Sequence, residues 1–200
     1  MANNFVNGFA SVVTAGEFYQ SDAADASTGP QTVYTANNGS SGVNSILIEL
    51  DAANTGTAGC TVTTFVQDTS ATLGTISSVV STSDVATVTT ATAHGLKVGM
   101  YVSVTGSTTN YVNGMYKVAS VPTATTFTYA QNSSAADGTA AGTIVIYKAY
   151  HVVKDAPLPS GSTLKIVAGQ KIVLNSNDKV LAYASAGTVD MIAGVLQEVT

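Results

Sequence analysis

Two stretches near the middle of the chain decide how the fold is read: HGLKVGMYVSV at residues 94–104 and GMYKVASV at residues 114–121. In both, apolar side chains alternate with small or polar ones, which is the period of a half-buried strand. The sequence GSTTN at residues 106–110 and the dipeptide Asn113-Gly114, a strong tight-turn signal, separate them. The sequence therefore predicts a small β-domain at residues 75–146, inserted into a chain whose flanks have their own strand pattern.

The predicted insertion has room for several short strands, as in a small barrel or sandwich. We expect them at residues 76–80, 85–90, 100–104, 115–121, 127–129 and 143–146. Met100, Val102 and Val104 would lie on one face, and Tyr116 and Val118 on a second. No stretch of the chain predicts an amphipathic helix of three turns.

The flanks, residues 32–74 and 147–200, predict one discontinuous β-domain. Its strands are expected at residues 31–35, 43–50, 60–66, 150–154, 162–168, 170–174, 179–184 and 188–199, with turns that include residues 37–42, 52–59 and 155–161. Ile46, Ile48 and Leu50 would share one face of their strand. Short, closely spaced strands indicate an antiparallel β-sandwich or jelly roll. Residues 1–31 are interpreted as an N-terminal edge strand or arm followed by a polar loop.

Composition limits the classes of function. Of 200 residues only 10% are charged, the net charge is −5, and all seven basic residues are lysines. Nucleic-acid binding depends on neutralising phosphates, so an acidic chain without arginine argues against it. A hydrophobic fraction of 45% argues against disorder. The N-terminus lacks the pattern of a secretory signal, and no apolar run approaches the length of a membrane span. We therefore expect neither a nucleic-acid nor a membrane partner.

Side chains that could carry chemistry are few and scattered. His94 and His151 fall in different predicted domains, and no nucleophile or carboxylate motif accompanies either. We expect His94 to brace a turn, and His151 to face solvent or a neighbouring subunit. Cys60, the single cysteine, cannot form an internal disulfide, so it is either a buried thiol or a bridge between subunits.

Two close acidic pairs, Asp22 with Asp25 and Glu49 with Asp51, raise the question of a cation site. Glu49 and Asp51 would point to one face of a strand, but Ca²⁺ takes six to eight oxygen ligands, so we favour a solvated strand end. The tyrosines of the insertion would divide between its core and an outward recognition surface; they are Tyr101, Tyr111, Tyr116 and Tyr129. No phosphate-binding glycine loop is present. The sequence predicts no catalytic, cofactor-binding or metal-binding residue.

The insertion resembles a small β-module of tailed-bacteriophage virion proteins. That module approximates Ala-Thr-Val-Thr-x-Ala-x-x-His-Gly-Leu, Gly-x-x-Val-x-Val-x-Gly, Asn-Gly-x-Tyr-x-Val and Thr-Thr-Phe-Thr-Tyr. The matching blocks lie in order at residues 86–96, 99–106, 113–118 and 125–129.

The flanks resemble a second phage structural β-domain. The resemblance rests on Val-Tyr-Thr-Ala at residues 33–36, YHVVKDAPLPSGSTL at residues 150–164, GQKIVL at residues 169–174 and the C-terminal strand near residues 195–198. In simpler relatives the strand at residues 61–67 would pass through a short turn at residues 68–71 directly into residues 150–152. The resemblance thus implies that a hairpin loop has accepted the second module, and loop tips tolerate such insertions.

These resemblances imply a non-enzymatic structural protein of a phage virion, made in the host cytoplasm. It would be a capsid decoration protein or a neck or tail accessory protein whose inserted domain projects from the particle. Its partners would be other virion proteins and further copies of itself, in a trimer or higher cyclic homo-oligomer. The alternative is a host-receptor or glycan-binding adhesin or fibre module, in which many copies strengthen a weak glycan contact. A polysaccharide lyase or hydrolase is the least expected class, because no active-site constellation is visible.

Overall fold

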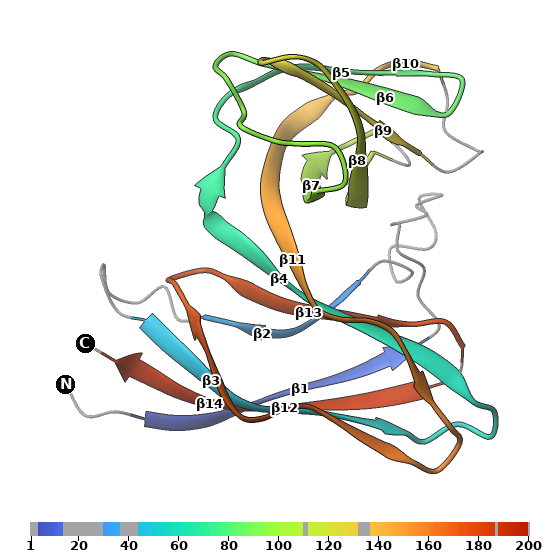
Figure 1. Ribbon diagram of the computed structural model, residues 1–200, viewed down its shortest axis with the longest axis vertical. Coiled ribbons are helices and arrows are strands. Elements are labelled where there is room, and N and C mark those ends of the chain that lie inside the picture. Colours follow the sequence, from blue (N-terminus) through green and yellow to red (C-terminus); the bar gives the residue numbers. More distant parts are fainter. Residues whose placement is uncertain are drawn as a thin grey trace. The chain divides into compact units, whose positions relative to one another are not determined.

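The structure, a computed structural model, describes residues 4–13, 30–36, 44–109, 112–131, 137–186 and 188–199. Over these residues it consists of antiparallel strands without a helix, so the predicted all-β class is confirmed (Figure 1). The chain divides into two compact units. Unit 1 contains the described residues of Met1–Gly16, Pro30–Ser70 and Tyr150–Thr200, and unit 2 contains those of Ala71–Ala149. The boundaries expected after residues 74 and 146 lie close to these divisions, whereas the loop expected after residue 14 and the turn at residues 37–42 fall almost wholly outside the described residues.

Unit 1 is a sandwich of two antiparallel sheets, which Figure 1 shows as two layers. The first sheet has the order β1 (Asn4–Val13), β14 (Thr188–Val199), β3 (Asn44–Asn54) and β12 (Thr163–Leu174). The second has the order β11 (Gly142–Leu158), β4 (Cys60–Thr72), β13 (Lys179–Ala184) and β2 (Gln31–Thr35). β11 contributes its residues from Tyr150 onward. The predicted sandwich is therefore observed, with β1 and β12 at the edges of one sheet and β11 and β2 at the edges of the other.

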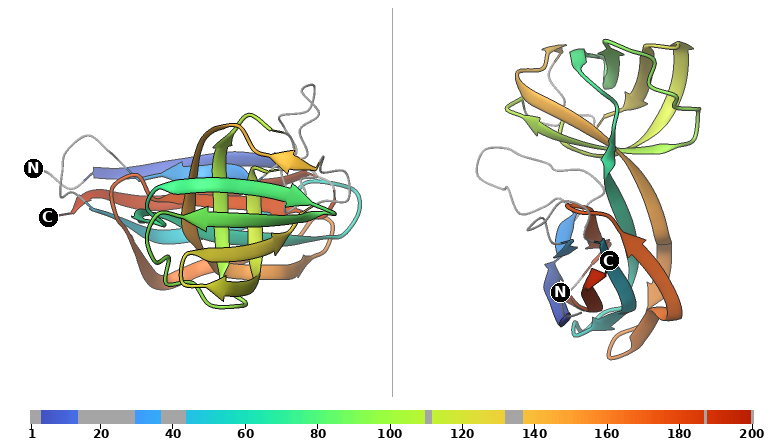
Figure 2. Two further views of the ribbon diagram at one scale, coloured as in Figure 1. Left: turned by 90° about the horizontal axis from the view of Figure 1, so that it is seen from above. Right: turned by 90° about the vertical axis from the view of Figure 1, so that its left-hand side faces the viewer.

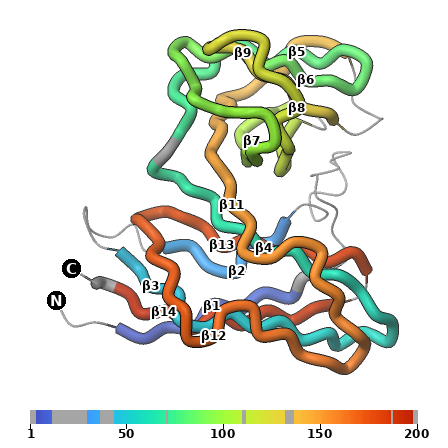
Figure 3. Tube along the Cα trace, in the orientation of Figure 1, coloured from blue at the N-terminus to red at the C-terminus, as the bar shows by residue number. Residues whose placement is uncertain are grey.

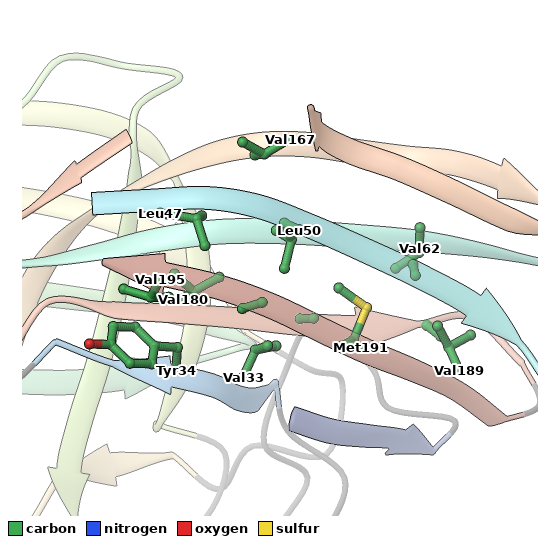
Figure 4. Close-up of a cluster of buried hydrophobic side chains, with 14 of the residues drawn as sticks. Val33, Tyr34, Leu47, Leu50, Val62, Val167, Val180, Val189, Met191 and Val195 are labelled. Carbon is green, nitrogen blue, oxygen red and sulfur yellow. The ribbon is translucent and has the colours of Figure 1, made fainter. Parts of the chain in front are cut away.

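The core of unit 1 is mainly aliphatic and lies between these sheets (Figure 4). β-branched residues favour strands, and their alternation turns every second side chain inward. Val62, Val180, Leu50 and Val189 are fully buried there, and each buried side chain of this size contributes about 1.5–3 kcal/mol. Tyr34 adds the polar exception, since its hydroxyl lies 3.1 Å from Ser45 Oγ and accepts a hydrogen bond from Gln197 Nε2 at 2.7 Å.

Ile46, Ile48 and Leu50 do not share one face of their strand as expected, because β3 contains a bulge. Leu47 and Glu49 are paired with β12 and β14 on either side, but both registers skip Ile48. An unpaired residue reverses the alternation of the strand. The buried positions therefore change from 45 and 47 before the bulge to 50, 52 and 54 after it. β3 also extends to Asn54, so the turn expected from residue 52 begins later.

The turn expected at residues 155–161 also begins later, because β11 continues to Leu158. Asp155 adopts a positive φ of 50°. Its N–H donates to Thr63 Oγ1 at 2.9 Å, and that hydroxyl donates to Asp155 Oδ1 at 3.3 Å, so a side chain of β4 stabilises the irregular residue. Pro157 is tolerated because this half of β11 is the edge of its sheet. Similarly, Gly169, with φ 76°, forms an irregularity inside β12 instead of separating two strands.

Unit 2 is a single curved sheet around its own core. Its order is β10 (Gly138–Thr139), β5 (Ile76–Thr82), β6 (Val85–Thr90), β9 (Thr126–Ala130), β8 (Gly114–Thr123), β7 (Tyr101–Ser107) and the first half of β11. Figure 2 shows β5, β6 and β9 lying side by side. The chain enters this unit from β4 and leaves it through β11, as the trace in Figure 3 shows.

Two alanines between β10 and β11 close this sheet into a barrel. Ala140 N donates to Val79 O of β5 at 2.8 Å, whereas Ala141 O accepts from Thr108 N, just after β7, at 2.9 Å. One continuous segment, from β10 into β11, thus pairs with β5 on one side and with β7 on the other. At the junction Gly106 and Gly142 have φ values of 81° and 105°, and a Cβ on either would overlap a carbonyl oxygen of the facing segment. Closure therefore depends on glycine at both positions.

Two expectations about unit 2 are wrong. Met100 is 40% exposed and precedes β7. Tyr116 and Val118 lie in the same core as Val102 and Val104, because Tyr116 pairs with Val102 across β7 and β8. Asn113-Gly114 lies where the connection between β7 and β8 ends, as expected, since β7 ends at Ser107 and β8 begins at Gly114.

Candidate functional site

A groove of about 320 Å³ lies in unit 1 where the edges of its two sheets face each other. One wall comes from β11 and β4, the other from β12, and the β12–β13 turn closes one end. The lining residues are Val66, Asp68, Tyr150, His151, Val152, Ile172, Val173, Asn175 and Asp178. The groove thus lies at the sandwich edge, where β12 ends its sheet and where β11 has passed the end of its pairing with β7 at Ala149.

Asp178 is the most buried polar group of the groove, with an exposed fraction of 3%. Its Oδ1 accepts hydrogen bonds from Thr69 N at 2.8 Å and Thr69 Oγ1 at 3.1 Å, and its Oδ2 accepts from Asn175 N at 2.8 Å. Donors within the chain therefore occupy both oxygens. Asp178 ties the β12–β13 turn to β4, which is a structural role and not that of a free acid or base.

His151 lies on the β11 wall, half-buried, with its ring 6.3 Å from that of Phe65. Burial lowers the pKa of its imidazole, the positive charge of Lys154 lowers it further, and Asp155 opposes the shift. The ring is therefore neutral at neutral pH. His151 thus lies in the wall of an open groove and is partly exposed, and the expectation that it faces solvent or a neighbouring subunit stays a prediction.

Tyr150 and Asp68 form the more accessible rim. Tyr150 is 55% exposed. Asp68 Oδ1 accepts hydrogen bonds from Ser70 N at 3.1 Å and Ser70 Oγ at 2.7 Å. An exposed aromatic ring beside amide and carboxylate groups suits weak binding of a polar ligand. No nucleophile paired with a general base occurs among the lining residues.

His94 braces a turn of unit 2. Leu96 N–H donates to His94 Nδ1 at 3.0 Å, and the ring packs edge-to-face on Phe127 with centroids 5.2 Å apart. Because Nδ1 accepts, the proton of the neutral ring is on Nε2. That nitrogen is buried without a hydrogen-bond partner among the described residues. The contacts are those of a local structural residue.

Cys60 is a buried thiol in the sandwich. Its Sγ lies 3.5 Å from Asn54 Nδ2 and 3.8 Å from Leu158 O. Burial raises the pKa of the thiol, which lowers its reactivity. The sequence left two alternatives open, a buried thiol or a bridge between subunits. The environment observed is that of a buried thiol.

Glu49 and Asp51 lie on the outer face of β3, as expected. Glu49 Oε1 is 3.5 Å from Lys165 Nζ on β12. The pKa of Asp51 is raised, first by burial and then by the charge of Glu49, against a lowering by Lys165. Among the described residues, no three His, Cys, Asp or Glu side chains gather as metal ligands would. Asp22 and Asp25 lie outside the described residues.

The tyrosines of unit 2 are mainly core residues. Tyr116 and Tyr129 stack with ring centroids 4.1 Å apart. Tyr116 Oη donates to Asn113 O at 3.2 Å, whereas Tyr129 Oη is buried without a hydrogen-bond partner among the described residues. Burial raises the pKa of both hydroxyls. Tyr101 is half-buried, and Tyr111 lies outside the described residues.

Sequence reasoning missed the groove, although Asp178 stands in the polar stretch between the strands expected at residues 170–174 and 179–184. Nothing in the local pattern shows that this turn faces β4, more than a hundred residues earlier. Comparison of the chain with protein-family models, with curated proteins and with solved structures finds no match.

Proposed function

We propose that the chain is a non-enzymatic structural protein of a tailed-phage virion, an oligomeric capsid decoration protein or a neck or tail accessory protein. The main supporting observation is the topology. Unit 2 is built between β4 and β11, which are neighbours in the sheet of unit 1. The barrel therefore occupies the position of a hairpin loop, where an added module leaves the host domain intact.

The chemistry of the described residues supports the same proposal. Both histidines, the cysteine and the buried Asp178 have structural contacts, and no metal-ligand cluster is found in the described part of the chain. The described ranges also contain no helix long and apolar enough to cross a membrane. A virion protein needs stable surfaces and no reaction centre, and the resemblance of both regions to phage structural domains supplies the class.

Purified particles of the encoding phage test this proposal. Mass spectrometry should detect the chain as a particle component, and antibody against residues 75–146 should label intact particles at regular positions. Antibody against a non-virion phage protein is the control. Particles that lack the chain would overturn the proposal. If the chain is present but the antibody does not label it, only the expectation that unit 2 projects from the particle would be wrong.

A second candidate function, weak glycan binding, is favoured by the groove of unit 1. Tyr150 offers an exposed ring beside Asp68 and Asn175, and carbohydrate sites combine such a ring with polar groups. The chain coupled to beads in many copies should bind host-cell glycans, and Tyr150→Ala should lower that binding roughly tenfold, whereas Tyr101→Ala in unit 2 should not. Equal binding by all three proteins would contradict the groove as the site.

A further inference from the structure

We propose that the edge strand β1 is an assembly surface, which pairs antiparallel with β1 of a second copy of this chain. The pairing would extend the four-stranded sheet of unit 1 into one continuous sheet across a two-fold axis. The inference concerns unit 1 alone and holds whether or not the chain belongs to a virion.

The other edges of unit 1 have features that oppose pairing with a further strand. β12 has two register irregularities, Gly169 at positive φ and two lysines, Lys165 and Lys171. The unit 1 half of β11 has Asp155 at positive φ and Pro157, which lacks an N–H. β2 has only five residues. Short length, lysine, proline and irregular backbone are the means by which natural sheets prevent edge-to-edge association.

β1 has none of these features. It is ten residues long, NFVNGFASVV, without charge or proline. Its register with β14 runs from Asn4 to Val13 without a shift. No other strand of the described residues pairs with it, because it ends the sheet order. A regular, uncharged edge of this length presents a row of backbone donors and acceptors that another strand can satisfy.

The strand is also held in place before any partner arrives. Val6 and Ala10 pack against the core on its inner side. Between them, Gly8 lies against β2, where a Cβ would lie 2.6 Å from Val33 O and 3.1 Å from Tyr34 Cβ. A pre-ordered edge loses less conformational entropy on association than a flexible arm.

The exposed side of β1 favours a second copy as the occupant. Phe5 and Phe9 point outward and are 75% and 67% exposed. In an antiparallel pair centred on Asn7, Phe5 of each copy lies opposite Phe9 of the other, so the symmetry itself supplies two aromatic cross-strand pairs. Because β1 carries no charge, two copies meet without repulsion between like charges.

The size of the chain in solution provides the first test. Light scattering during size exclusion should give a dimer, or an even-numbered assembly, at micromolar concentration. Phe5→Lys with Phe9→Lys places like charges at the axis and should weaken the two-fold contact roughly tenfold or more, because two aromatic pairs are lost. Both side chains are exposed, so circular dichroism should be unchanged.

Val173→Lys is the matched control, since Val173 is 59% exposed on the outer face of the opposite edge strand β12. It should leave the assembly unchanged. In a second test, Asn7→Cys should form a disulfide between copies under mild oxidation, whereas Val173→Cys and the unchanged chain, with Cys60 buried, should not. A monomeric chain at these concentrations, or an assembly that neither the lysines nor Asn7→Cys affects, would overturn the inference. Loss of binding to another protein without loss of self-association would assign β1 to a different partner and overturn it as well.

Discussion

Unit 1 and unit 2 handle the edges of their sheets in opposite ways. In unit 2 the segment through Ala140 and Ala141 joins the two ends of the strand order, so the barrel closes on itself. In unit 1 two sheets face each other and leave four edge strands. The barrel therefore offers the outside mainly side chains, whereas the sandwich also offers backbone groups. This difference is the reason why the proposed strand pairing is assigned to unit 1 and not to unit 2.

The largest effect is expected from Gly106→Val, which should open the barrel of unit 2 and so remove its difference from unit 1. The new side chain would overlap Thr143 O and would have to adopt a φ of 81°. We expect a loss of about 3 kcal/mol or more, measured as the free energy of unfolding in urea. Gly95→Ala is the control, because Gly95 has a positive φ and no atom within 4 Å of an added Cβ; it should cost about 1 kcal/mol. Equal losses would show that close approach does not govern closure.

Asp178→Ala tests the open edge of the sandwich. The substitution removes the acceptor of Thr69 N and Asn175 N and one of the two acceptors of Thr69 Oγ1, in a part-buried place. A loss of about 2–3 kcal/mol in unfolding free energy is expected. Asp68→Ala, which removes exposed hydrogen bonds from Ser70, should cost less than about 1 kcal/mol. If Asp178→Ala were as mild, the turn would not depend on its contact with β4.

The two stacked tyrosines, Tyr116 and Tyr129, allow the contribution of each buried hydroxyl to the stability of the barrel core to be compared. Tyr116→Phe removes a hydrogen bond to Asn113 O and should destabilise the chain by about 1 kcal/mol. Tyr129→Phe removes a buried hydroxyl that has no partner among the described residues, so it should be neutral or stabilising by a similar amount. Thermal unfolding of the two variants side by side measures the difference. Destabilisation by both to the same extent would indicate that Tyr129 Oη is hydrogen-bonded.

Asp51→Asn, a substitution on the outer face of the sandwich, is expected to have the smallest effect on the free energy of unfolding. Burial and Glu49 raise the pKa of Asp51 in the folded chain above its unfolded value. The folded state thus binds the proton more tightly, and stability falls as pH rises from the unfolded pKa through the folded one. The amide removes this penalty, so the variant should be more stable at neutral pH by no more than about 1 kcal/mol and should gain nothing at low pH. Urea unfolding across that range measures it; an equal gain at every pH would contradict a titration effect.

Local patterns predicted several strands to the residue. The expected strands at residues 31–35, 85–90, 179–184 and 188–199 coincide with β2, β6, β13 and β14. In these segments β-branched residues and turn signals agree with the final fold. The failures lie at irregular positions: the bulge at Ile48, the positive φ of Asp155 and the glycine crossing at Gly106. Each depends on a neighbouring strand that is distant in the chain.

The candidate site was less predictable than the fold. His94 was expected to brace a turn, and its hydrogen bond from Leu96 lies within two residues, so the local sequence contains the necessary information. The groove at the sandwich edge brings together β4, β11, β12 and a turn, and its geometry has no local signature.

The sequence by itself determined that this chain is all-β, where most strands lie and which polar residues stand in turns, because strand period and turn chemistry act over a few residues. Only the tertiary structure decided which strands become edges, that unit 2 closes and that β1 is a regular edge strand with β14 as its one pairing partner among the described residues. Pairing, register and closure depend on contacts between segments far apart in the chain, and no local pattern specifies those partners.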